Sequence, residues 1–147
     1  MKRINIDPSK CVGCRICEIT CSFHHFGVFS HELSNCNIDS EDALGNFTPL
    51  ICIQCEERSC VHSCPVEALS IDPVTGAVRC DHDKCIKCGL CIKACDHKGI
   101  GFIMLDGEDR IAVCDLCGGD PKCVKRCFIK AITFEDDDAV CDKENSL

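Results

Sequence analysis

The sequence contains no tryptophan, no tyrosine and no long apolar segment. Because a membrane-spanning helix needs about 18 or more consecutive apolar residues, no membrane insertion is expected. Residues 1–7 carry two basic side chains but no apolar stretch, so we do not expect a secretory signal. A glycine-rich phosphate loop, a dinucleotide fingerprint and a serine elbow are also missing. The sequence therefore predicts no active site of these common kinds.

Basic residues are in the minority, with 16 Lys and Arg against 24 Asp and Glu, and the formal net charge is −8. A chain of this charge is not expected to bind nucleic acid, because that binding depends on neutralising phosphates. The hydrophobic content of 46% includes 19 cysteines, so the ordinary apolar core is thin. The fold must therefore be stabilised by something besides apolar packing.

Cysteine is the abundant residue type, and 16 of the 19 cysteines fall into four runs. The first and third runs have the same spacing, C-x2-C-x2-C-x3-C, which makes them an internal repeat. The second run is C-x2-C-x4-C-x3-C and the fourth is C-x2-C-x5-C-x3-C. In chain order the runs are Cys11, Cys14, Cys17 and Cys21; Cys52, Cys55, Cys60 and Cys64; Cys85, Cys88, Cys91 and Cys95; and Cys114, Cys117, Cys123 and Cys127.

The spacing within each run indicates iron–sulfur ligation. A loop with three closely spaced cysteines can turn three thiolates toward one [4Fe-4S] cluster while backbone N–H groups face the sulfurs. Zinc is the alternative, but four-thiolate zinc sites have two C-x2-C pairs separated by a longer spacer. A disulfide framework fits poorly with an odd cysteine count and no secretory signal. We therefore expect metal ligation in a reducing compartment, the cytoplasm.

The cysteine runs also carry a family resemblance. From Cys11 to about Phe134 the chain resembles the four-cluster, ferredoxin-like electron-transfer subunits that accompany molybdenum or tungsten pterin enzymes, certain hydrogenases and carbon monoxide dehydrogenases. In that family the first run pairs with the fourth and the second with the third, and the last cysteine of a run ligates the partner cluster. The resemblance thus implies four [4Fe-4S] clusters, on Cys11, Cys14, Cys17 and Cys127; Cys114, Cys117, Cys123 and Cys21; Cys52, Cys55, Cys60 and Cys95; and Cys85, Cys88, Cys91 and Cys64.

Two segments resemble a narrower group of proteins within this family. Residues 11–34 and 114–127 are similar to the small subunits of tungsten aldehyde oxidoreductases and of the tungsten-dependent benzoyl-CoA reductase. The family usually has proline after the last cysteine of a run, and here only Cys64 is followed by one, Pro65. This departure leaves the thiol ligands intact but changes their surroundings.

The segments between the runs predict a small α+β fold with two ferredoxin-like lobes, built from short hairpins and short helices. We expect an inner lobe at residues 50–101 and an outer lobe formed by residues 1–49 together with 102–147. Hairpins are predicted over 68–81 and over 101–114, the second around an Asp-Gly turn. Residues 3–6 and 131–134 read as terminal strands that pair, and short helical turns are expected after the last cysteines, as at 66–69.

These features predict an electron-transfer subunit without an active site of its own, because every run supplies four thiolates and leaves no iron open. The subunit would relay single electrons between a catalytic subunit, of the tungsten or molybdenum pterin kind that the resemblance implies, and an external flavin or ferredoxin carrier. A free polyferredoxin shuttle and a relay subunit of a hydrogenase or carbon monoxide dehydrogenase remain alternatives. The sequence fixes neither the direction of electron flow nor the partner.

Several residues remain outside the cluster pattern. The histidines after the first run are expected to pack and form hydrogen bonds at an interface, with an extra metal or a proton relay as the alternative. The surplus cysteines are expected to be thiols without a role. The phenylalanines at helical spacing fit either core or an apolar interface, which we favour. The lysines near the third run are expected to balance cluster charge, and the acidic tail to be solvated. These groups are His24, His25 and His31; Cys36, Cys80 and Cys141; Phe23, Phe26 and Phe29; Lys84, Lys87, Lys93 and Lys98; and Glu135, Asp136, Asp137, Asp138, Asp142 and Glu144.

Overall fold

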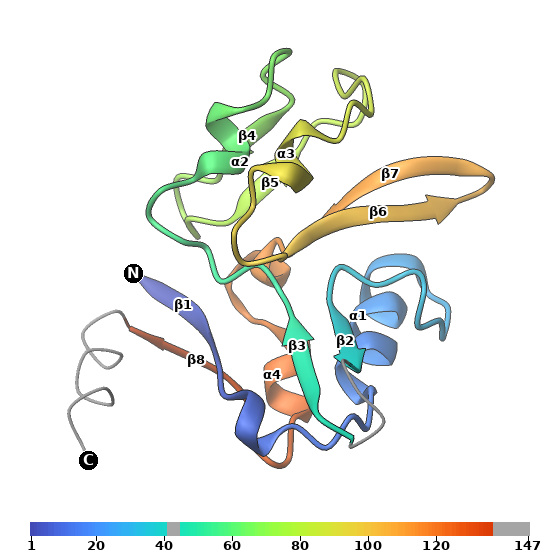
Figure 1. Ribbon diagram of the computed structural model, residues 1–147, viewed down its shortest axis with the longest axis vertical. Coiled ribbons are helices and arrows are strands. Elements are labelled where there is room, and N and C mark those ends of the chain that lie inside the picture. Colours follow the sequence, from blue (N-terminus) through green and yellow to red (C-terminus); the bar gives the residue numbers. More distant parts are fainter. Residues whose placement is uncertain (41–44, 137–147) are drawn as a thin grey trace.

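Figure 1 shows a computed structural model of the chain, which describes residues 1–40 and 45–136. Cys141 and the acidic tail from Asp137 onward lie outside the described residues. The elements are short: apart from one helix of 11 residues, no described helix or strand exceeds six residues. Such short elements leave most of the described chain as loops, which have to be held in place by contacts far apart in sequence.

The two ends of the described chain pair with each other, as expected. Strand β1 (Lys2–Ile6) runs antiparallel to β8 (Ile132–Asp136), with Ile4 opposite Phe134. Ile4 and Ile132 are almost fully buried, so this ribbon is held by apolar packing as well as by its hydrogen bonds. The pairing brings the first cysteine run close to the fourth.

The other described strands form three further two-stranded sheets. The two predicted hairpins are confirmed, as β4 (Leu69–Ile71) with β5 (Val78–Cys80) and as β6 (Ile100–Leu105) with β7 (Glu108–Val113). Asp106 and Gly107 both have positive φ, 53° and 80°, as the tight Asp-Gly turn between β6 and β7 requires. The third sheet, β2 (Asn37–Ser40) with β3 (Phe47–Leu50), was not predicted.

The helices do not lie where the sequence suggested. Residues 66–69 were expected to form a helical turn after the last cysteine of the second run, and that expectation is wrong. Glu67 has φ 50° and Leu69 already belongs to β4, because the chain must reverse after Pro65. Each helix instead contains the third cysteine of a run. The helices are α1 (Ile16–Phe26), α2 (Ser59–His62), α3 (Leu90–Lys93) and α4 (Lys122–Arg126), with 3₁₀ turns η1 (Pro8–Lys10) and η2 (Leu116–Gly119).

The helices pack in pairs that follow the predicted pairing of runs. Helix α1 of the first run packs against α4 of the fourth, and α2 of the second run packs against α3 of the third. In Figure 1 α2 and α3, coloured green and yellow, lie in the upper part of the molecule and α1 and α4 in the lower part, while the orange hairpin β6–β7 lies at the right, above α1. The described chain is thus a small mixed α/β fold of short helices and hairpins in two halves.

One glycine lets the start of β6 pack closely against the second run. A Cβ atom at Gly99 would lie 2.6 Å from both the Cα and the N atom of Cys52, and 2.8 Å from the carbonyl carbon of Ile51. Ile51 has no exposed surface, and these neighbours are backbone atoms that cannot rotate away. Residue 99 must therefore be glycine for the start of β6 to pack against the second run.

We expect Gly99→Ala to destabilise the cluster-loaded chain by about 1–3 kcal/mol or more, because overpacking a close backbone contact forces the two segments apart. The measurement is the thermal midpoint of the loaded chain. Gly101→Ala is the matched control, since nothing lies within 4 Å of its Cβ position. Equal midpoints for the two variants would contradict the close-contact interpretation.

Candidate metal centres

The four runs share one local backbone conformation. The residue two positions after the first cysteine has a positive φ in every run, between 58° and 67°. This left-handed residue turns its N–H back toward the first sulfur, and such hydrogen bonds are present at Cys11, Cys52 and Cys114. Backbone N–H groups facing a thiolate offset its negative charge. The residues are Gly13, Gln54, Lys87 and Leu116.

The folded chain brings the cysteines together in four sets, each with three members from one run and one from its partner run. In each set, burial and the charge of neighbouring thiols raise the pKa of one or more members. We label the sets A to D. Set A is Cys11, Cys14, Cys17 and Cys127; set B is Cys21, Cys114, Cys117 and Cys123; set C is Cys52, Cys55, Cys60 and Cys95; and set D is Cys64, Cys85, Cys88 and Cys91.

The pKa shifts within a set have two physical causes. Burial raises the pKa of Cys123 to about 12, and the nearby thiols of Cys21 and Cys117 contribute in the same direction. Burial also raises the pKa of Cys52 to about 12, again with help from neighbouring thiols of its set. Thiolates this close together repel one another in a poorly hydrated site. A bound cation removes the repulsion, so each set fits a thiolate-ligated metal group.

The surroundings of set D fit an iron–sulfur cluster. All four of its sulfurs line one cavity, whose other walls include Ala68, Leu69 and Ile111. The N–H of Ala68 also donates a hydrogen bond to Cys64 Sγ at 3.3 Å. Soft sulfur ligands, an apolar wall and N–H donors are the environment that iron–sulfur clusters occupy in proteins. Every cysteine in the described part of the chain is a free thiol and can therefore act as a ligand.

Gln54 connects set C to set B, and sequence reasoning missed it. Its side chain is 2% exposed and donates a hydrogen bond from Nε2 to the carbonyl of Cys114 at 2.7 Å. Its Oε1 accepts from the N–H of Val78 at 3.0 Å and from Arg58 at 2.8 Å. A polar side chain between two cysteines of a run carries no sequence signal of such long-range contacts.

A buried polar network surrounds the helix of the first run. Glu18 has no exposed surface, accepts the N–H of Ile38 at 2.6 Å and pairs with His31 at 2.7 Å and Arg15 at 3.2 Å. Ser22, also fully buried, accepts the N–H of Ser30 at 3.1 Å. These contacts fasten the loop of residues 27–37 onto the helix that carries two ligand positions.

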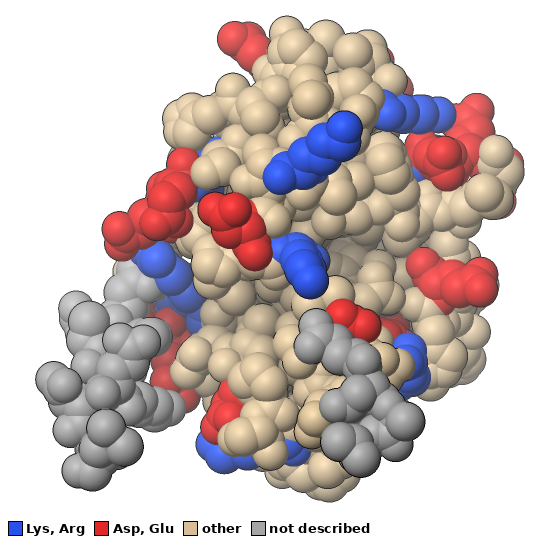
Figure 2. Space-filling view, viewed as in Figure 1, with Lys and Arg blue, Asp and Glu red and all other residues tan. Residues whose placement is uncertain are grey.

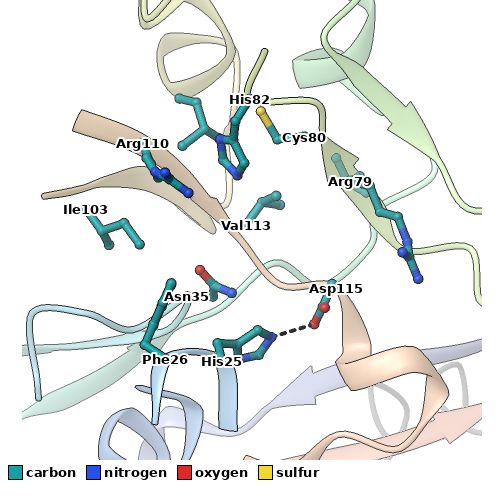
Figure 3. A pocket seen from close by; sticks show the side chains of 12 residues that line it. His25, Phe26, Asn35, Arg79, Cys80, His82, Ile103, Arg110, Val113 and Asp115 are labelled. Carbon is teal, nitrogen blue, oxygen red and sulfur yellow. Dashed lines mark hydrogen bonds and ion pairs between the residues drawn. The ribbon is translucent and has the colours of Figure 1, made fainter. Parts of the chain in front are cut away.

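His25 links the two ends of the chain at set B. Its Nε2 lies 3.1 Å from Asp115 Oδ1, and Asp115 accepts the N–H of Cys117 at 2.9 Å (Figure 3). The hydrogen bonds with Asp115 and then Cys21 raise the pKa of His25 to about 11. The pair lies in the wall of a cleft of about 270 Å³ that Cys80 also lines. His25 and His31 are hydrogen-bonding residues, as predicted, and His24 is exposed.

The phenylalanines after the first run do not belong to the core. Phe23 and Phe29 are 52% and 74% exposed, and their rings stack on each other with centroids 4.7 Å apart. Lys84 and Lys87 near the third run lie within 4.0 Å of the carboxylates Asp81 and Glu108. On the face seen in Figure 2, basic and acidic side chains are interspersed rather than gathered by sign. No helix in the described chain is long and apolar enough to cross a membrane.

Family comparisons agree with this chemistry. Residues 3–29 match the family described as "4Fe-4S binding domain" and residues 51–98 match "4Fe-4S dicluster domain". The chain is 46% identical over 124 residues to the polyferredoxin-like subunit of aliphatic sulfonate oxidoreductase from Pyrococcus furiosus, covering 84% of this chain and 70% of that protein. It is 32% identical over 143 residues to the putative electron transport protein YsaA of Escherichia coli, covering 88% and 87%.

A further relative is longer. The beta subunit of NADH-dependent phenylglyoxylate dehydrogenase from Aromatoleum evansii is 34% identical over 126 residues, which are 84% of this chain and 28% of that protein. In fold, the chain is similar to a chain of the BamBC active-site complex of benzoyl coenzyme A reductase, with a TM-score of 0.51, 23% identity and 98% and 86% of the chains covered. The fold and the cysteine sets define a ferredoxin-like iron–sulfur protein with four [4Fe-4S] clusters. The chain belongs to the family of polyferredoxin-like electron-transfer subunits.

We expect Gln54→Leu to destabilise the cluster-loaded chain by about 1–3 kcal/mol, because the buried carbonyl of Cys114 and N–H of Val78 lose their partners. The measurement is the guanidinium midpoint for bleaching of the visible cluster absorbance. Glu57→Ala, at an exposed position of the same loop, is the control. A Gln54→Leu midpoint equal to that of the control would show that these hydrogen bonds do not hold sets B and C together.

Proposed function

We propose that the chain relays single electrons through four [4Fe-4S] clusters, one on each of sets A to D, between a catalytic oxidoreductase subunit and an external carrier. When bound, the clusters supply four one-electron carriers. The chain's own residues fix the spacing of these carriers and their electrostatic surroundings. The observation that carries the proposal is that thiols of one proposed set lie next to thiols of another, A beside B, B beside C and C beside D.

The order of the row follows from contacts between sets. Burial is the main cause of the raised pKa of Cys123 in set B, and the nearby thiol of Cys17 in set A raises it further. Burial is also the main cause of the raised pKa of Cys114 in set B, and the nearby thiol of Cys52 in set C contributes in the same direction. Cys60 of set C contributes to the raised pKa of Cys91 in set D, where burial again dominates. These neighbours support the order A, B, C, D.

Both ends of the row reach the surface. Among the described cysteines only Cys14 of set A and Cys88 of set D are exposed. Exposed apolar side chains stand beside each of them: Val12 is 56% exposed next to Cys14, and Ile86 is 60% exposed next to Cys88. An exposed apolar residue beside a redox group suits a protein contact that excludes water during electron transfer. The two ends therefore support two separate docking partners.

For the catalytic partner we propose a tungsten or molybdenum pterin subunit, and for the carrier a flavoprotein or ferredoxin. Two relatives carry names of oxidoreductase subunits, for sulfonate and phenylglyoxylate, and the cysteine segments resemble those of tungsten enzymes. We also propose that the lobes comprise residues 50–101 and residues 1–49 with 102–147, joined within β6. Because iron ligation needs reduced thiols, the cytoplasm is the proposed compartment.

Elemental analysis of the complex tests the partner. The complex is recovered anaerobically through a tag on this chain, and iron, tungsten, molybdenum and nickel are counted together. We expect tungsten or molybdenum with at least ~16 irons per copy of the chain, for four clusters. Nickel would indicate a hydrogenase or carbon monoxide dehydrogenase instead, and iron alone with no retained protein would indicate a free shuttle.

Iron counts in double variants test the assignment of ligands to sets. If Cys11 and Cys127 hold the same cluster, the Cys11→Ala/Cys127→Ala chain loses about 4 irons, the same as either single variant. The control pair, Cys11→Ala/Cys123→Ala, removes ligands from sets A and B and is expected to lose about 8. A loss of about 8 irons in the first double variant would refute the crossed assignment.

A further inference from the structure

The ring of His25 lies beside set B and is held by contacts on both of its nitrogens. His25 belongs to the last turn of α1, four residues after Cys21, and its side chain is 17% exposed. Nδ1 lies 2.9 Å from the carbonyl oxygen of Cys21, and Nε2 lies 3.1 Å from Asp115 Oδ1 (Figure 3). The ring of His24 packs edge-on against that of His25, with centroids 5.0 Å apart. Together these contacts fix the orientation of the His25 ring.

The partners of the two ring nitrogens determine where His25 carries hydrogen. A carbonyl oxygen can only accept a hydrogen bond, so Nδ1 is the donor to Cys21. Asp115 Oδ1 also accepts the N–H of Cys117 at 2.9 Å, which marks it as an acceptor, so Nε2 donates to it as well. The ligand atoms of His24, His25 and Cys117 lie within 4.8 Å of one another and could suggest an extra metal site. With hydrogen on both nitrogens, however, His25 has no lone pair free to bind a metal ion.

The Nδ1–H group of His25 also reaches a proposed cluster ligand. Nδ1 lies 3.7 Å from Cys21 Sγ, a hydrogen-bonding distance for sulfur, so one N–H is shared between the carbonyl oxygen and the sulfur of Cys21. On the other side of the ring, Asp115 connects His25 to the backbone of Cys117, a second member of set B. Cys21 belongs to the first run and Cys117 to the fourth. His25 therefore joins the two ends of the chain at one proposed cluster.

We propose that His25 is a positioning residue that donates a hydrogen bond from Nδ1–H to the ligand sulfur of Cys21 and so raises the reduction potential of the cluster on set B. This inference rests on the proposed ligation of set B. A donor to a ligand sulfur stabilises the more negative, reduced state of the cluster, and outer partners of this kind also orient the ligand. In the described chain His25 makes no such contact with a sulfur of another set, so one potential of the four is expected to depend on it.

The test is an anaerobic redox titration of the full, cluster-loaded chain followed by electron paramagnetic resonance, with His25→Phe and His25→Asn beside wild type. Phenylalanine keeps a ring but has no donor, so we expect one of the four midpoint potentials to become more negative. Asparagine has an amide N–H that can donate from near the position of Nδ1, so His25→Asn is expected to restore part of the shift. His62→Phe, the same substitution at an exposed histidine of α2, is the matched control and is expected to leave all four potentials unchanged.

Iron content separates the possible failures. All variants are expected to keep about 16 irons, like wild type. A loss of about 4 irons in both His25 variants would show that the imidazole itself ligates iron and would overturn the inference. Unchanged potentials in variants that keep all four clusters, or equal shifts in His25→Phe and His25→Asn, would overturn it too and leave the relay proposal standing. A wild-type chain that binds fewer than four clusters would refute the relay proposal itself.

Discussion

Electrostatic repulsion between closely spaced thiolates is the constraint on which the rest of this structure depends. Four thiols converge in each set, and buried members such as Cys52, Cys114 and Cys123 have pKa values raised by burial and by neighbouring thiols. Ionised together without a cation they would force the loops apart. We therefore expect the fold to depend on its bound metal groups, because ligation free energy is part of its folding free energy. The thin apolar core is consistent with this dependence.

The backbone of each run reduces the same repulsion between thiolates. A left-handed residue after the first cysteine aims an N–H at the sulfur, and in three runs a second left-handed residue follows the last cysteine by three positions, at Glu67, Lys98 and Lys130. That second turn reverses the chain before the next strand. The first run is the exception, because α1 continues past Cys21 to Phe26. Its longer helix provides the surface onto which Glu18 and Ser22 fasten the loop that carries Cys36.

Much of this organisation could be predicted from the sequence because it is local or periodic. The cysteine spacing indicated the runs, and the Asp106–Gly107 pair predicted a hairpin that needs two positive φ values. The position of the helices was predicted wrongly, because the reversal after Pro65 depends on packing and not on propensity. The β2–β3 hairpin has no turn signal comparable to Asp-Gly. Gln54 acts through partners far away in the sequence, such as Cys114 and Val78, so only the structure could reveal it.

The distribution of hydrogen-bond donors also bears on how four clusters with the same ligands can differ. Each set has four cysteine thiolates, so ligand identity cannot separate their potentials. The surroundings differ instead: backbone N–H groups face sulfurs in several runs, whereas His25 Nδ1 lies 3.7 Å from Cys21 Sγ in set B, and a ring nitrogen of His97 lies within 4.8 Å of Cys55 Sγ in set C. Set C lies inside the row with its link to set B made by Gln54 through a carbonyl, not through a sulfur. Any difference in potential between the four clusters must therefore come from these surroundings and not from the ligands.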